Sequence, residues 1–252
     1  MAWVETVSNG FKARHESNDQ EGAVEVLGVL DSARTRLEGV FARPVEGDIT
    51  VVIHASMFAL SLAQPYLPLA RRATAPSGRR YLVGWFTRSE LHVLSPAALR
   101  RRASSVQGSK EMLKLAPAAL YAHLTIGANN PDLPPPFTPA SFRQQLRWGW
   151  LAHGAAQYFS GQIDHVRPAI ARRLRDGSAP RFPPAMRDAP LLGGSVFDLL
   201  VSEQGKRAAI SLATLPLAAG GSDAALSKAF SGRSLGDTEG VWRAHLSRLA
   251  SQ

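Results

Sequence analysis

Two apolar helical segments on either side of a proline-rich stretch constrain the fold of this chain most strongly. Ala116–Asn129 reads APAALYAHLTIGAN, and residues 148–162 read WGWLAHGAAQYFSGQ. Residues 131–139, PDLPPPFTP, lie between them, and their prolines exclude both a helix interior and a central strand. We therefore place a boundary there, between an N-terminal lobe of residues 1–130 and a helical C-terminal lobe of residues 131–252.

The order of hydrophobic patterns along the chain predicts its fold class. Residues 4–15 are consistent with one strand that carries Phe11, Ala13 and His15 on one face. The next segments predict a long helix at residues 21–41, a buried strand at residues 48–54, and a short helix and a loop at residues 57–70. A hairpin of residues 81–86 and 90–94 follows, and Ser95 then caps a further helix. Because the pattern beyond the linker is mainly helical, we expect an α+β fold.

Charge and composition exclude several classes of protein. The formal net charge is +9, and of the 29 basic residues five are lysines and 24 are arginines. The arginine clusters are short and do not alternate with aromatic residues, so nucleic-acid binding is not expected. No apolar run approaches the roughly 20 residues that cross a bilayer, and there is no cysteine. We expect a cytoplasmic protein without a membrane span.

Residues 150–158, WLAHGAAQY, carry the most informative motif in the chain. This run resembles the WLxEGxAxY helix of gluzincin-type zinc metallopeptidases, the peptidase-MA-like families. The HExxH helix of those families lies shortly upstream, where this chain has AHLTI at residues 122–126. The offset of 27 positions from Ile126 to His153 suits that family's spacing. Three further runs resemble family segments in the same order: residues 81–96, 193–205 and 229–246.

The resemblance implies a zincin-like fold with two lobes. A small twisted sheet would lie over a central helix, the former active-site helix, and the WLxxG helix would lie beside that helix in the helical C-terminal lobe. Residues 81–96 would supply the edge-strand hairpin that precedes the zinc helix. A substrate cleft would run between the two lobes.

The same resemblance implies that the zinc chemistry has been lost. The two metal-binding histidines of HExxH fall on Ala122 and Ile126, the general base on His123, and the third ligand, a glutamate, on His153. Neither Ala nor Ile can bind a metal, and no glutamate lies between Glu111 and Glu203. We therefore predict no catalytic residue, no metal and no cofactor.

His123 and His153 would still face the cleft, and three interpretations of this pair stay open. They are buried structural histidines bonded to backbone, tyrosine or each other; or a rebuilt metal site completed by His92 or Asp164; or a recognition site for a partner.

Four aromatic residues are the other candidates for a binding cleft. Trp150 and Tyr158 belong to a stripe with three-to-four spacing that is typical of core packing, and Tyr158 is at most a cleft residue. Trp85 and Phe86 lie on the expected edge strand, where they either accept an extended peptide by strand addition or cover the core.

Three functions follow from these observations. The first is a catalytically inactive metallopeptidase-like protein, a binding or regulatory module that uses the former cleft for an unidentified peptide or protein partner. The alternative is a metal-dependent hydrolase or peptidase with an atypical site built on His123 and His153. The second alternative is a basic module that binds nucleic acid or an anionic surface.

Overall fold

A mixed sheet and a large set of helices make up the fold in the computed structural model, which describes residues 2–217 and 221–251. The α+β class predicted from the sequence is confirmed. The strands of the described sheet run in the order β1-β2-β3-β5-β4. β2, β3 and β5 are parallel, and β1 and β4 are antiparallel strands at the two edges. The bounds are β1 Trp3–Ser8, β2 Phe11–Glu16, β3 Ile49–His54, β4 Gly84–Phe86 and β5 Glu90–Leu94.

The first predicted strand, residues 4–15, is instead a hairpin of β1 and β2. Ser8 pairs with Phe11, so the turn consists of Asn9 and Gly10. Gly10 has φ +80°, and an Asn-Gly pair favours this left-handed turn conformation. The predicted face of β2 is confirmed, because Phe11, Ala13 and His15 are all fully buried.

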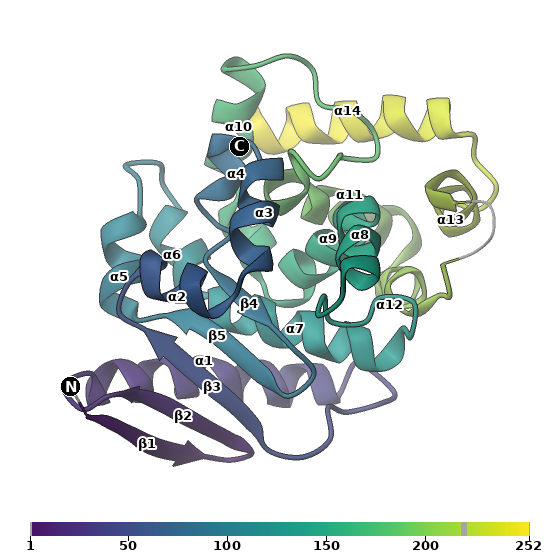
Figure 1. The fold of residues 1–252 in the computed structure, drawn as a ribbon. Coiled ribbons are helices and arrows are strands. Elements are labelled where there is room, and N and C mark those ends of the chain that lie inside the picture. The colour runs from purple at the N-terminus through teal and green to yellow at the C-terminus, as the bar shows by residue number, and fades with distance from the viewer. Residues whose placement is uncertain (1, 218–220, 252) are drawn as a thin grey trace.

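Helices cover both faces of the sheet (Figure 1). α1 and α7 share a hydrophobic core with Val51 and Leu91 on one face, whereas α2, α3 and α5 pack with Trp85 and Leu94 on the other. The helices before the linker are α1 Gln20–Glu38, α2 Met57–Ala63, α3 Tyr66–Ala73, α4 Pro76–Arg79, α5 Pro96–Arg102, α6 Ser109–Lys114 and α7 Ala116–Asn129.

The chain beyond the proline-rich linker is helical, as predicted. It begins with a capping box in which the side chains of Thr138 and Ser141 each bond the other's backbone, with Pro139 as the first helical residue. These helices are α8 Pro139–Arg147, α9 Gly149–Phe159, α10 Arg167–Arg175, α11 Ala189–Gln204, α12 Lys206–Thr214, α13 Gly221–Ala229 and α14 Leu235–Ser251, with a short 3₁₀ helix at Gln162–His165.

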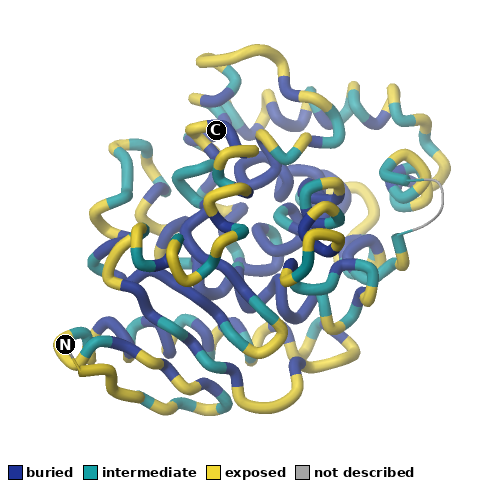
Figure 2. Tube along the Cα trace, viewed as in Figure 1, coloured by how far each residue is buried: buried dark blue, intermediate teal, exposed yellow. Residues whose placement is uncertain are grey.

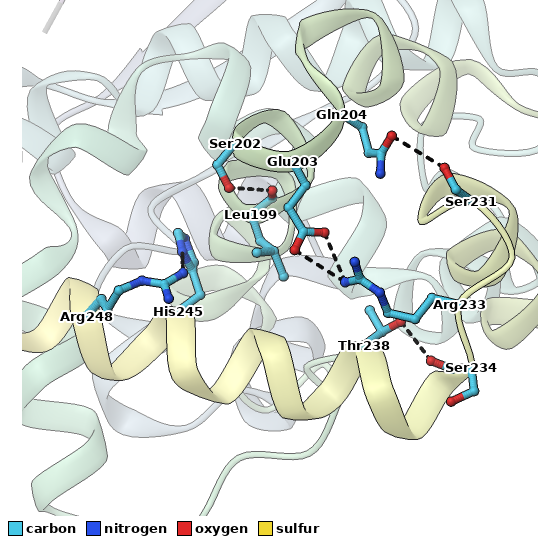
Figure 3. Close-up of polar contacts among 10 residues, drawn as sticks. All are labelled: Leu199, Ser202, Glu203, Gln204, Ser231, Arg233, Ser234, Thr238, His245 and Arg248. Atoms are coloured by element: carbon cyan, nitrogen blue, oxygen red, sulfur yellow. Dashed lines mark hydrogen bonds and ion pairs between the residues drawn. The ribbon is translucent and has the colours of Figure 1, made fainter.

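The last helix, α14, is held against the rest of the protein by polar contacts as well as by its apolar face. Arg233, just before α14, pairs with Glu203 of α11 at 3.0 Å, and Ser231 donates to the Gln204 side chain (Figure 3). Deeper in, the Trp242 indole donates to the Ser195 hydroxyl at 2.8 Å. This bond satisfies the indole N–H of Trp242, which is fully buried.

One hydrophobic core joins residues from both sides of the linker. It extends from Phe11 on β2 to Leu249 on α14, and Figure 2 shows the buried interior running through both parts. The start of the linker is anchored, because Asn130, the residue before it, donates to the carbonyls of Ala213 and Leu215, and Asp132 accepts from the backbone N–H of Leu217. Of the helices in the described residues, none is long and apolar enough to cross a membrane.

Candidate functional site

The central feature of the molecule is the contact between α7 and α9. The sequence predicts these two helices as neighbours, and the structure confirms it. α7 carries Pro117 in its first turn and ends at Asn129, and the extended backbone of Asn130 precedes Pro131. α9 ends at Phe159, Ser160 caps it, and the following Gly161 has φ +82°, the left-handed conformation that ends many helices.

A glycine pair allows α9 to approach α11 closely. A Cβ atom built on Gly154 would lie 2.6 Å from the carbonyl oxygen of Gly193. One built on Gly193 would lie 2.8 Å from the backbone nitrogen of Gly154. The glycine of the WLxxG motif is therefore needed for backbone packing.

His123 of α7 and His153 of α9 meet between the two helices. Their ring centroids are 5.1 Å apart, with the rings nearly perpendicular. Phe86 of β4 stacks on the other side of the His123 ring at 4.8 Å. His123 is buried, which agrees with the interpretation of the pair as structural histidines. Its described contacts with Phe86 and His153 are ring packing contacts rather than hydrogen bonds.

A small cavity lies beside this pair, enclosed by β4, α7 and α9. Its volume is about 50 Å³, and its lining includes His123, His153, Trp85, Phe86, Gln157 and Gln162. Pockets that enclose a drug-sized ligand measure about 300–1,000 Å³. The cavity therefore admits a water-sized group or the tip of a side chain.

Burial keeps both imidazoles neutral. It lowers the pKa of His153 to about 4. The pKa of His123 is well below its usual value, mainly because of burial and then because of the positive charge that His153 would carry. At neutral pH each ring therefore presents one N–H donor and one nitrogen acceptor.

The four positions that the resemblance aligns with a zinc site are divided between two environments. His123 and His153 line the cavity, whereas Ala122 and Ile126 are buried at 0% and 2% exposure in the main core and are not among its lining residues. The face of α7 that lines the cavity carries Ala116, Ala119, Leu120 and His123. This division follows from the helical period, which turns successive residues by about 100°.

Neither of the residues considered for completing a metal site joins the pair. His92 points to the opposite face of the sheet. There its Nδ1 atom lies 3.1 Å from Nε2 of His54, and its Nε2 atom lies 2.8 Å from Nε2 of Gln64. Asp164 is exposed and lines a different cavity. Residues 2–217 and 221–251 contain no cluster of three or more His, Asp or Glu side chains that could hold a metal ion.

The aromatic candidates have different surroundings. Trp85 and Phe86 line the cavity and are buried, and Trp85 also packs near Phe142 of α8. Trp150 is 2% exposed and donates to the Ser222 hydroxyl, so it is a core residue. Tyr158 is partly exposed, packs against Phe197, and is not among the cavity's lining residues.

Two features of this region escaped the sequence reasoning. The first is the polar wall of the cavity: Gln157 bonds Pro190 and Gly194 on α11, and Gln162 bonds the carbonyl of Met112. The sequence signal for this wall was Gln157, a polar residue within the otherwise apolar run of residues 150–158. The second is the buried pair of His54 and His92, which depends on the register of β3 and β5.

The chain was compared with protein-family models, with curated proteins and with solved structures, and none of these comparisons returned a match.

Proposed function

We propose that this chain is a catalytically inactive, metallopeptidase-like protein with a zincin-like frame, and that it binds a peptide or protein partner at the former cleft. The observation that carries the proposal is the composition of the site. The positions that resemble the zinc ligands and the base hold Ala122, His123, Ile126 and His153, and only the two histidines can bind a metal.

The arrangement of the elements supports the frame. An antiparallel hairpin, β4 and β5, precedes the central helix, and β4 is an edge strand that packs on that helix. α9, which carries the WLxxG run, lies beside α7. These are the neighbours that the resemblance implies.

The cavity supports recognition of a small group. Two neutral imidazoles offer donors and acceptors beside apolar walls from Trp85 and Phe86. Because the cavity measures about 50 Å³, a partner would insert only the tip of one side chain and make its remaining contacts on the rim.

Reconstruction of the motif tests the frame. The variant Ala122→His, His123→Glu, Ile126→His, His153→Glu carries three ligands and a base. We expect it to bind zinc, to rise in melting temperature when zinc is added, and to cleave peptides in a chelator-sensitive manner. A matched control omits His153→Glu and lacks the third ligand. A folded reconstructed variant that binds zinc no better than this control would count against the zincin-like frame.

A metal-dependent hydrolase built on the histidine pair is the competing function, and the contact between the two rings favours it. Stable zinc sites usually have three or four protein ligands. The described structure supplies two here, so we rank this function second.

A further inference from the structure

A second and larger cavity opens between α4, α10 and residues 176–188. Its volume is about 370 Å³. Its walls carry four arginines from three separate segments: Arg80, Arg172, Arg173 and Arg187. Among the described residues that line it, the only carboxylate is Asp176.

Two of the four arginines are neutralised by carboxylates. Arg173 forms a buried bidentate pair with Asp188, with nitrogen–oxygen distances of 2.9 and 3.0 Å. Arg172 pairs with Asp176 at 3.1 Å. In the part of the chain that the structure describes, Arg80 and Arg187 form no salt bridge; Arg80 donates to the backbone carbonyl of Arg102. The cavity therefore carries two uncompensated positive charges.

The region behind Arg80 adds to this positive potential. Burial, then the charges of Arg102 and Arg79, lowers the pKa of Arg71 to about 10. The pKa of Arg102 is lowered by burial and then by Arg80. The Nε atom of Arg102 is buried and has no hydrogen-bond partner in the described part of the chain. An anion at the cavity would stabilise the arginines on this side of the molecule.

The other lining groups favour a phosphate ester over a bare ion. Ser77 and Ser178 contribute hydroxyl-bearing side chains, and Tyr81 and Val106 contribute apolar surface. Guanidinium groups match the oxygens of a phosphate with paired N–H donors. A volume of about 370 Å³ exceeds the need of inorganic phosphate and lies in the range of small-ligand pockets.

We propose that this cavity binds a small organic phosphate monoester. Arg80 and Arg187 would bind the phosphate, and Tyr81 and Val106 would contact the organic part. Tyr81 also lines the histidine cavity, but none of the four arginines does. The proposal therefore does not depend on the proposed function of the histidine pair.

Isothermal titration calorimetry with phenyl phosphate tests the proposal. We expect saturable binding of one molecule per chain, tighter than that of inorganic phosphate because the ring adds apolar contacts. Arg187→Gln should weaken binding about tenfold or more, since it removes a charge-assisted contact. Arg80→Gln should act likewise, and Arg187 is exposed, so at least one variant should fold normally.

Arg181→Gln is the matched control, because Arg181 is exposed on the same segment but does not line the cavity. It should retain wild-type affinity, as should His153→Ala. Three results would overturn the proposal: no saturable binding, a loss in Arg181→Gln as large as in Arg187→Gln, or tighter binding of succinate than of phenyl phosphate. The second would indicate general attraction of anions, and the third a carboxylate site.

Discussion

At the residue scale, the proposal that Ala122 and Ile126 occupy former ligand positions has a physical consequence. A buried histidine or glutamate without its metal would cost about 1–3 kcal/mol for each unsatisfied polar group. Ala122 and Ile126 carry no such group and are 0% and 2% exposed. The two apolar side chains thus remove a source of instability from the centre of the molecule.

The packing of Ile126 can be measured directly. Ile126→Ala should destabilise the fold by roughly 2–5 kcal/mol, because it removes a large side chain from a closed core. Leu62→Ala, at a position that is 77% exposed, is the control and should change stability little. Urea denaturation that gave equal stabilities for the two variants would mean that Ile126 faces open space.

The lowered pKa of His153 predicts a dependence of stability on pH. The pKa of His153 is about 4 in the folded state, below its unfolded value of about 6.5. The unfolded chain therefore binds more protons between these values, so the free energy of unfolding falls as pH falls from about 6.5 to about 4.

His153→Gln should lose less stability than wild type across this window, by up to about 1.4 kcal/mol per pH unit. Urea midpoints from pH 8 down to pH 4 check this expectation. Above about pH 6.5 the difference between the two proteins should be constant, which serves as an internal control. Parallel curves throughout would show that the pKa of His153 is not lowered in the folded protein.

At the element scale, the contact between α9 and α11 brings two helix backbones close together beside the site. Gly154 and Gly193 allow it, and Gln157 of α9 extends it with bonds to Gly194 and Pro190. These contacts hold α9 in place against α11. His153 is a residue of α9, so they also set its position. The orientation of His153 therefore depends on a contact that involves neither histidine.

Gly154→Ala tests this dependence. The added Cβ would lie 2.6 Å from a backbone oxygen that cannot rotate away, so we expect a loss of about 1–3 kcal/mol or more. Gly240→Ala on α14 is the matched control, because a Cβ there meets nothing within 4 Å. That helix should gain about 0.5–1 kcal/mol. Thermal denaturation in which the two variants behave alike would contradict the packing described.

At the scale of the whole molecule, the sequence predicted what local patterns and motif order can encode. The hairpin of β4 and β5 and the adjacency of α7 and α9 were predicted. The break at Asn9 and Gly10 was missed because apolar residues continue on both sides of the turn. The pair of His54 and His92 and the arginine cavity depend on long-range register and on segments distant in sequence, which no local pattern specifies.

The zinc content of the wild-type protein tests the central claim most directly. Protein purified, incubated with zinc and dialysed should contain far less than one zinc per chain by elemental analysis, and added zinc should not raise its melting temperature. His123→Ala should give the same values. A zinc content of about one per chain in the wild type, lost in His123→Ala, would show a working metal site and contradict the proposal of an inactive protein.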